Sequence, residues 1–354
     1  MLLRRLSEAS GVSGREIQVR QILIESLREH VDELTTDTLG NLIATKRAEG
    51  LQKDSRKCVT QKCVMVAAHM DEVGLMITRI DESGLLRFAA VGGIDNRILP
   101  ATVVLIGDKQ VAGVIGIPPV HLSEKNGLGR VIEAKKLGID IGVSGKEEAR
   151  RLAKPGDYAV FATEFSELDE KGDGLRTVRG KAFDDRAGCA VLVELLKTRY
   201  PFDLCGVFTV QEEVGLRGAR VAAYTLDPDC AFALEATGAN EIPTDKDQSP
   251  STRLGNGPAI TTMDRSFIAD KRLVRLLMDT AVELELPYQI KQPGIGGTDA
   301  GAIQPTRGGV PSITVAIPCR YIHSPASILS KTDFACTVRL VQESLLRLPE
   351  RLSW

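Results

Sequence analysis

The sequence predicts an α/β fold: a mostly parallel mixed sheet sandwiched by helices and interrupted by an inserted β-rich, barrel-like domain. After residue 180, strand and helix patterns alternate, as they do in sheets covered by helices on both faces. From about residue 73 to 171, short β-type runs recur between turns that contain Gly or Asp, which indicates a separate β-rich module. We therefore expect an α/β domain made of residues 1–72 and 172–354, with residues 73–171 inserted.

The elements before the insertion are one helix and one buried strand. Ser13 and Glu16 have the spacing of a capping box, and a mostly helical pattern of apolar residues follows up to Val31. The continuous apolar run 63–68 predicts a strand that is buried on both faces.

The later elements follow from the same patterns. In the insertion we expect strands at 75–80, 85–91, 101–106 and 111–117, with a charged helical piece at 147–152. Beyond it, helices are expected at 186–197, 219–224, 272–284 and 333–346, and strands at 206–210, 231–234 and 312–317.

Composition excludes some classes of function. The 45 basic and 47 acidic residues are interspersed and give a net charge of −2, so we expect no nucleic-acid partner and no membrane-surface binding. No apolar stretch reaches the length of a bilayer. The polar N-terminus and seven scattered cysteines favour a cytoplasmic protein with reduced thiols.

Two adjacent carboxylates, Glu212 and Glu213, follow the predicted strand 206–210. Neighbouring side chains on extended backbone point to opposite sides, so one glutamate can hold a metal ion while the other handles a proton. Metal-assisted hydrolysis uses this division of roles. Taken alone the pair is a weak signal, because a Glu-Glu pair on a surface loop is ordinarily just solvated.

Further segments supply ligand-type side chains. His69 and Asp71 follow the strand 63–68 and share a face of the extended chain, where a carboxylate can support a metal-bound imidazole. Asp184 and Asp185 precede a helix and are alternatively its N-terminal caps. Glu235 and His323 come at the end of one predicted strand and shortly after another.

Most of these residues lie at or just past the carboxyl end of a predicted strand, where open α/β sheets bind ligands. Nitrogen and oxygen donors without thiolate suit zinc, cobalt or manganese. Charge counting favours two ions: three carboxylates (Asp184, Glu213, Glu235) with two divalent cations leave +1, which a bridging hydroxide cancels.

At these segments the chain resembles the glutamyl and deblocking (TET-type) aminopeptidases, a family of dinuclear metallopeptidases. The matching stretches are Ala68-His-Met-Asp-Glu-Val-Gly74, Ala182-Phe-Asp-Asp-Arg-Ala-Gly188, Gln211-Glu-Glu-Val-Gly-Leu-Arg-Gly-Ala219, Leu234-Glu-Ala-Thr237, Tyr321-Ile-His-Ser-Pro325, Gly296-Gly-Thr-Asp-Ala-Gly301 and Ile139-Asp-Ile-Gly-Val143. The resemblance implies a catalytic domain interrupted by a β-rich assembly module, peptide substrates, and self-assembly into dimers or larger shells, including dodecamers.

The resemblance also implies roles for individual residues. Asp184 bridges two divalent ions, His69 and Glu235 complete one site, and Glu213 and His323 complete the other. Glu212 is the general base, and Asp71 orients His69. Many relatives carry aspartate where Glu235 stands, which leaves its binding mode and the preferred metal open.

Other interpretations remain open at this point. The first is a dinuclear deacylase or carboxypeptidase acting on N-acyl amino acids, which needs a group that binds the substrate carboxylate. A polysaccharide hydrolase and a metal-stabilised scaffold are the others. The loop 294–301 is either a wall of the substrate pocket or a tight turn, and Thr298 and Asp299 have no assigned role. Arg217 and Arg220 are expected to pair with local carboxylates, with contact to an acidic substrate side chain as the alternative. His121 is expected to be structural, with a role in a neighbouring subunit's active site as the alternative.

Overall fold

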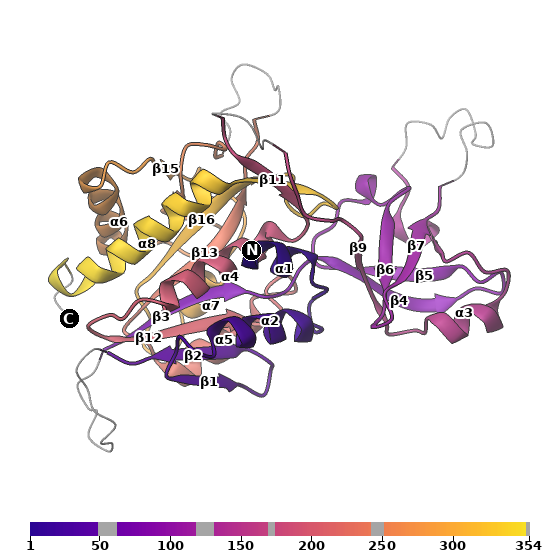
Figure 1. Cartoon of the computed structure of the whole chain (residues 1–354), viewed down its shortest axis with the longest axis horizontal. Helices are drawn as coiled ribbons and strands as arrows, with labels where there is room; N and C mark the ends of the chain where they lie inside the picture. The colour runs from indigo at the N-terminus through magenta and orange to yellow at the C-terminus, as the bar shows by residue number, and fades with distance from the viewer. Residues whose placement is uncertain (49–61, 118–130, 169–173, 242–250, 352–354) are drawn as a thin grey trace.

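The computed structural model describes residues 1–48, 62–117, 131–168, 174–241 and 251–351. Within these residues, one large sheet with its helices and a separate barrel lie side by side along the long axis (Figure 1). The chain leaves the sheet domain for the barrel after His69 and returns after Phe161. The expected mixed sheet with flanking helices and an inserted barrel-like domain is confirmed.

Within the described ranges the large sheet has eleven strands, nine of them in the order β1-β2-β12-β3-β13-β16-β17-β11-β10. Its four central strands, β12, β3, β13 and β16, are parallel neighbours. Antiparallel strands extend the sheet on both sides, and β14 and β15 lie off this path. The strands are β1 (Glu33–Thr36), β2 (Leu42–Lys46), β3 (Cys63–His69), β10 (Ser166–Glu167), β11 (Thr177–Gly180), β12 (Asp203–Thr209), β13 (Cys230–Gly238), β14 (Ala259–Thr261), β15 (Gln289–Ile290), β16 (Ser312–Arg320) and β17 (Ser327–Ser330).

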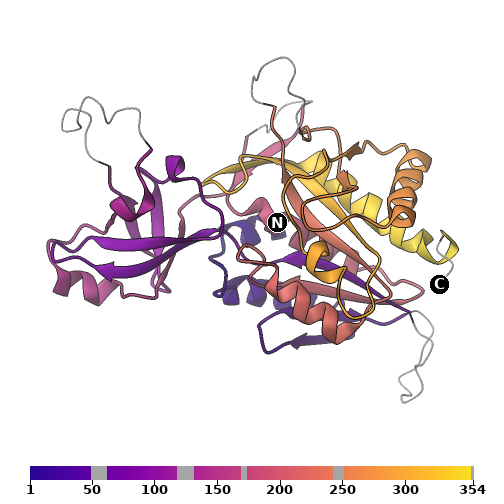
Figure 2. The same cartoon turned by 180° about the vertical axis from the view of Figure 1, so that it is seen from behind.

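Helices cover both faces of this sheet, which explains why its central strands are apolar throughout. In β3, Val64 and Val66 pack into the core under α1, α2, α4, α6 and α8, whereas Met65 and Ala67 pack under α5 and α7. Figure 2 shows the second face from behind. The helices are α1 (Leu2–Glu8), α2 (Ile17–Leu27), α4 (Phe183–Leu196), α5 (Arg217–Leu226), α6 (Lys271–Glu283), α7 (Ala300–Ile303) and α8 (Lys331–Arg351).

The barrel closes in the strand order β4-β5-β8-β7-β6-β9 and has its own apolar core. Closure leaves no unpaired strand edge, so a small antiparallel module can stand beside the sheet domain without exposing a template for aggregation. Its elements are β4 (Gly74–Ile80), β5 (Leu86–Val91), β6 (Val103–Ile106), β7 (Val111–Ile115), β8 (Ile139–Asp140), α3 (Lys146–Leu152) and β9 (Tyr158–Phe161), with short 3-10 turns η1 (Asn96–Ile98) and η3 (Ala134–Lys136).

The capping box expected before α2 is wrong. Ser13 Oγ donates to Asp71 Oδ2 at 2.6 Å, and no side chain caps the helix. Glu16 Oε1 instead accepts from the backbone N–H groups of Gly14 and Gln211. Both residues therefore tie the N-terminal segment to the segments that follow β3 and β12.

No helix in the described ranges is long and apolar enough to cross a bilayer.

Candidate metal centre

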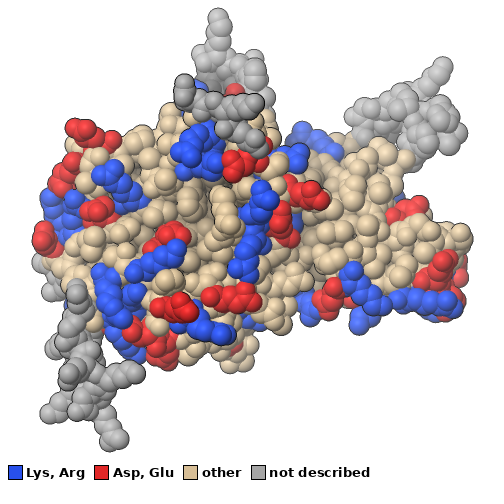
Figure 3. All heavy atoms as spheres, in the orientation of Figure 1, with Lys and Arg blue, Asp and Glu red and all other residues tan. Residues whose placement is uncertain are grey.

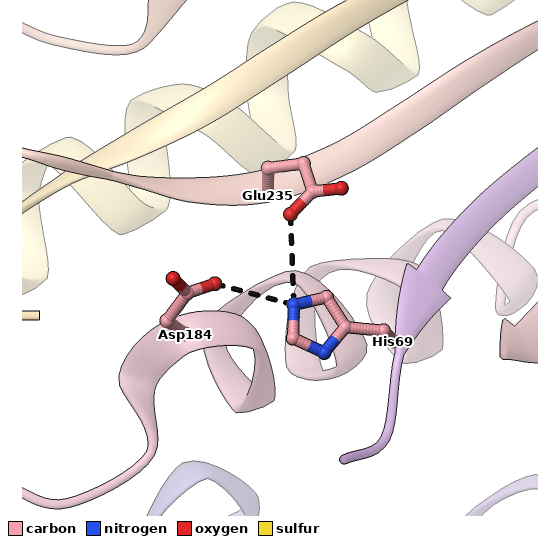
Figure 4. Close-up of side chains that lie close together, drawn as sticks. All are labelled: His69, Asp184 and Glu235. Carbon is pink, nitrogen blue, oxygen red and sulfur yellow. Dashed lines mark hydrogen bonds and ion pairs between the residues drawn. The ribbon is translucent and has the colours of Figure 1, made fainter. Parts of the chain in front are cut away.

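Three side chains from three elements meet at the carboxyl end of the parallel strands. His69 ends β3, Glu235 lies in β13, and Asp184 stands in the first turn of α4 (Figure 4). Nε2 of His69 lies 3.3 Å from Oδ1 of Asp184 and 3.6 Å from Oε2 of Glu235. These three residues each offer one ligand atom within 4.8 Å of the others.

A second group forms on the other oxygen of the same aspartate. Nε2 of His323, in the loop after β16, lies 3.3 Å from Asp184 Oδ2 and 3.4 Å from Glu213 Oε1. Asp184, Glu213 and His323 again offer ligand atoms within 4.8 Å of one another. Asp184 thus faces one histidine with each of its two oxygens, which is the geometry of a carboxylate shared by two ion sites.

Glu212 is close to both groups but belongs to neither of them. Its Oε2 lies 3.9 Å from Nε2 of His69, and with His69 and Glu213 it forms a third potential ligand group. Distance alone therefore permits Glu212 to act either as a ligand or as a proton acceptor beside the ions.

Asp71 fixes the backbone of the glutamate pair. Its carboxylate oxygens accept from the backbone N–H groups of Glu212 and Glu213 at 3.0 and 3.1 Å. Nδ1 of His69 lies 3.1 Å from the Asp71 carbonyl oxygen and 3.5 Å from its carboxylate. Asp71 thus contacts both His69 at the end of β3 and the backbone of Glu212 and Glu213 after β12. It therefore fixes the position of His69 relative to the two glutamates.

Asp185 holds the other side of the site. One carboxylate oxygen accepts from Gly188 N–H inside α4, as a helix cap does, and the other accepts from His69 N–H. The peptide between Asp184 and Asp185 is cis. The capping role considered for Asp185 is therefore present and also anchors the end of β3.

A buried charge cluster lies beneath the site. Lys181 Nζ contacts both carboxylate oxygens of Glu72 at 2.7 Å, and Arg186 Nη2 contacts the same carboxylate at 3.2 Å. All three side chains are almost fully buried. Since Glu72 is neutralised by two cations, this acid beside Asp71 has a structural role.

The segments that carry the ligands have unusual backbone. Ala182, Gln211 and His323 are non-glycine residues with φ of 55°, 57° and 55°. Each stands within two residues of a predicted ligand or is one itself. Left-handed backbone at such residues costs about 1–3 kcal/mol each and clusters at functional sites.

Burial and mutual repulsion shift the acids of the site. Burial raises the pKa of Glu213 to about 7, and the adjacent Asp184 carboxylate adds to the shift. Burial likewise raises the pKa of Glu212 and of Glu235 well above the usual range. Burial opposes a charged His323, but Asp184 outweighs it and raises the pKa of His323 to about 10.

The raised pKa values of these glutamates show that their negative charges are unfavourable unless positive charge lies beside them. Protons supply that charge when no cation is bound, so metal binding displaces protons and weakens as the pH falls. Oε1 of Glu213 is buried and makes no hydrogen bond, and His323 Nε2 lies 3.4 Å from it, so a cation between the two would satisfy this oxygen. Imidazole nitrogens with carboxylate oxygens and no thiolate suit a divalent transition metal, so the residues present fit such ions.

The ligand groups open into a cavity of about 460 Å³. The loop expected to be either a pocket wall or a turn lines it through Ile295, Gly296, Gly297 and Thr298. Thr298 Oγ1 also bonds to Asp264 and Thr314 inside the fold. The N–H of Asp299 donates to Glu235 Oε1 at 3.2 Å, so the same loop supports a ligand.

Sequence reasoning missed several residues around the centre. Thr209 donates to the Asp299 carboxylate, whose pKa burial raises to about 6. Lys291 and Ser251 line the cavity. These are single polar residues without a motif, so only their position in space identifies them.

Of the expectations outside the centre, the one for Arg217 can be compared with the structure. Arg217 donates to the side-chain oxygen of Gln211 rather than to a carboxylate. His121 lies outside the described residues.

The fold and this site together define a metal-dependent hydrolase of the aminopeptidase class. The family model for M42 glutamyl aminopeptidases matches residues 40–340, and the chain belongs to this family. It is 33% identical to a lysyl aminopeptidase of Pyrococcus furiosus over 97% of its own length and 96% of that protein.

Solved structures of similar proteins support the same family assignment. A TET aminopeptidase from the marine sediment archaeon Thaumarchaeota archaeon SCGC AB-539-E09 has a TM-score of 0.91 at 36% identity and covers 99% of this chain and 96% of that one. The TET1 peptidase of Pyrococcus horikoshii, described as assembling into a tetrahedron or a large octahedral shell, has a TM-score of 0.83 at 34% identity, with 98% of both chains covered. As a member of this family, the chain is a metal-dependent aminopeptidase and a peptidase hydrolase.

Proposed function

We propose that this aminopeptidase releases N-terminal residues with the help of two divalent ions, zinc or cobalt with manganese as a further candidate, and that Glu212 is its general base. The observation that supports two ions is the position of Asp184, whose two oxygens face His69 and His323 separately. In this proposal His69, Asp184 and Glu235 hold one ion, and Asp184, Glu213 and His323 hold the other.

The catalytic steps assigned to this chain's residues follow from their positions. When bound, divalent ions polarise a carbonyl and lower the pKa of a water molecule to about 7. Glu212, whose pKa burial raises, takes the proton from that water and returns it to the departing amine. Asp71 keeps Glu212 in place through its backbone N–H. The acids that line the cavity attract the free N-terminal amine of a peptide, which accounts for action at chain ends.

A panel of substrates tests this function against the deacylase alternative. The chelated protein, given back zinc, cobalt or manganese, is assayed on aminoacyl p-nitroanilides, on the same anilides with an acetylated amine, and on N-acetyl amino acids. We expect cleavage of the free-amine anilides, dependent on added metal, and little cleavage of the acetylated ones. Hydrolysis of N-acetyl amino acids without cleavage of free-amine substrates would instead establish the deacylase.

We also propose that the chain self-assembles through its inserted domain, residues 73–171. Val103 and Val114 are cross-strand neighbours on β6 and β7 that are 49% and 44% exposed. Exposed apolar neighbours of this kind favour an interface. On the face shown in Figure 3, acidic and basic side chains are interspersed over the larger domain and lie mainly along the edges of the smaller one, which suits protein partners better than nucleic acid.

The native mass tests the assembly. Light scattering should give a mass of at least twice the 38.3 kDa of one chain, and the double substitution Val103→Lys with Val114→Lys should lower it. Val221→Lys, at an exposed valine on α5, is the matched control and should leave the mass unchanged. A wild-type mass of a single chain contradicts the proposal.

A further inference from the structure

The turn that carries Glu212 and Glu213 is held from outside by carboxylates. Three consecutive backbone N–H groups, those of Gln211, Glu212 and Glu213, each donate to a carboxylate oxygen of another segment. Asp71 accepts the second and the third, and Oε1 of Glu16 accepts the first at 3.2 Å. Glu16 therefore does for Gln211 what Asp71 does for the two glutamates.

This turn needs such support because its backbone is strained on both sides of the glutamate pair. Gln211 and Leu216 are non-glycine residues in the left-handed region, with φ of 57° and 56°. Left-handed backbone at such residues persists only where the surroundings enforce it. The place of the Glu212 side chain thus depends on the acceptors that hold the N–H groups of the turn.

Glu16 is itself firmly fixed. It is 5% exposed, and the same Oε1 also accepts from the backbone N–H of Gly14 at 2.7 Å. It directly precedes α2, whose residues Val19, Leu23 and Leu27 are buried in the core of the sheet domain. An acceptor at the start of a packed helix does not follow a turn that moves away, so it sets where the turn lies.

The same N-terminal segment reaches the turn by a second route. Ser13 Oγ donates at 2.6 Å to Oδ2 of Asp71, the oxygen that also accepts from the N–H of Glu213. Ser13 thus holds the carboxylate that holds the turn, whereas Glu16 holds the turn directly. The effect of the second contact is the easier to test, because no other side chain stands between Glu16 and the turn.

We infer that Glu16 is a positioning residue for the aminopeptidase reaction: through the N–H of Gln211 it places the carboxylate of Glu212 for proton transfer. This inference rests on the proposed role of Glu212 as the general base. Glu16 does not line the cavity beside the ligand groups in the described structure, so it acts through the turn and not on the substrate. A displacement of about 1 Å in a reacting group costs about 100-fold in rate, which makes even a small shift of the turn measurable.

Glu16→Ala removes the acceptor of the Gln211 N–H and should lower kcat on a free-amine aminoacyl p-nitroanilide by about 10-fold or more at saturating metal. KM should change much less, because Glu212 acts in the chemical step. Glu16→Gln keeps an oxygen that accepts from the same N–H and should restore most of kcat. Glu16→Asp keeps the charge but draws the acceptor back on a shorter side chain, and it should again lower kcat.

Glu8→Ala is the matched control. Oε1 of Glu8 accepts from the backbone N–H of Phe165 at 3.1 Å, so this variant also loses a carboxylate that holds a backbone N–H, but not one next to a predicted ligand. All variants are assayed at a temperature at which circular dichroism shows an intact fold, and Glu8→Ala should keep the wild-type kcat. An equal fall of kcat in Glu8→Ala and Glu16→Ala would show that Glu16 contributes stability alone, against the inference.

A double substitution separates positioning from general damage. If Glu16 acts through Glu212, adding Glu16→Ala or Glu16→Asp to Glu212→Gln should lower kcat little further, because the base that Glu16 positions is already lost. Losses that multiply, or a wild-type kcat in Glu16→Ala alone, would overturn the inference and leave the general base intact. A wild-type kcat in Glu212→Gln would refute the proposed base itself.

Discussion

Glu212→Gln should lower kcat by about 10²–10⁴-fold, the usual contribution of a general base, while both metal ions stay bound. The glutamine has the same side-chain size and keeps the hydrogen bond from its backbone N–H to the Asp71 carboxylate, but its amide cannot accept a proton from water. The measurement combines kcat on an aminoacyl p-nitroanilide with the metal content per chain from elemental analysis.

Metal content decides between the two roles that distance permits for Glu212. If the variant loses an ion together with its activity, Glu212 is a ligand, as the group with His69 and Glu213 allows. Wild-type turnover would exclude both roles. Glu194→Gln is the matched control, because Glu194 on α4 makes a surface ion pair with Lys197 just after the helix, and such pairs contribute at most about 1 kcal/mol.

Asp184→Asn should affect metal binding most. The substitution removes the negative charge between His69 and His323, and an amide cannot hold two cations as a carboxylate does. We expect fewer than two ions per chain after dialysis, and a loss of activity beyond the roughly 10–100-fold that follows loss of a residue supporting a ligand. The thermal shift on adding zinc or cobalt should shrink as well, because ligands stabilise only the state that binds them.

Asp227→Asn is the control for this change. Asp227 is an exposed residue with left-handed backbone at the end of α5, a conformation that asparagine tolerates equally well. We expect two ions and full activity in this variant. Two tightly bound ions in Asp184→Asn itself would show that the aspartate does not bridge them.

Much of the fold was predictable because the burial pattern of each element is local. The run 63–68 is apolar at every position, and β3 is indeed covered on both faces. The positions of the antiparallel strands that flank the parallel centre were not predicted. Strands such as Ser166–Glu167 and Ser327–Ser330 are short and carry no periodic pattern, so pairing with distant neighbours makes them strands.

Within the site, the sequence determined which residues have ligand chemistry, since His69, Asp184, Glu213, Glu235 and His323 stand in motifs at the ends of predicted elements. Ser13 and Glu16 show the limit of such patterns: their spacing satisfies a local rule, but contacts to Asp71 and Gln211 prevailed. Only the tertiary structure decided that Asp184 turns one oxygen to each histidine and that Lys291 lines the cavity beside them. Such properties depend on which distant segments meet, and a charge is satisfied or left unpaired only once the chain has folded around it.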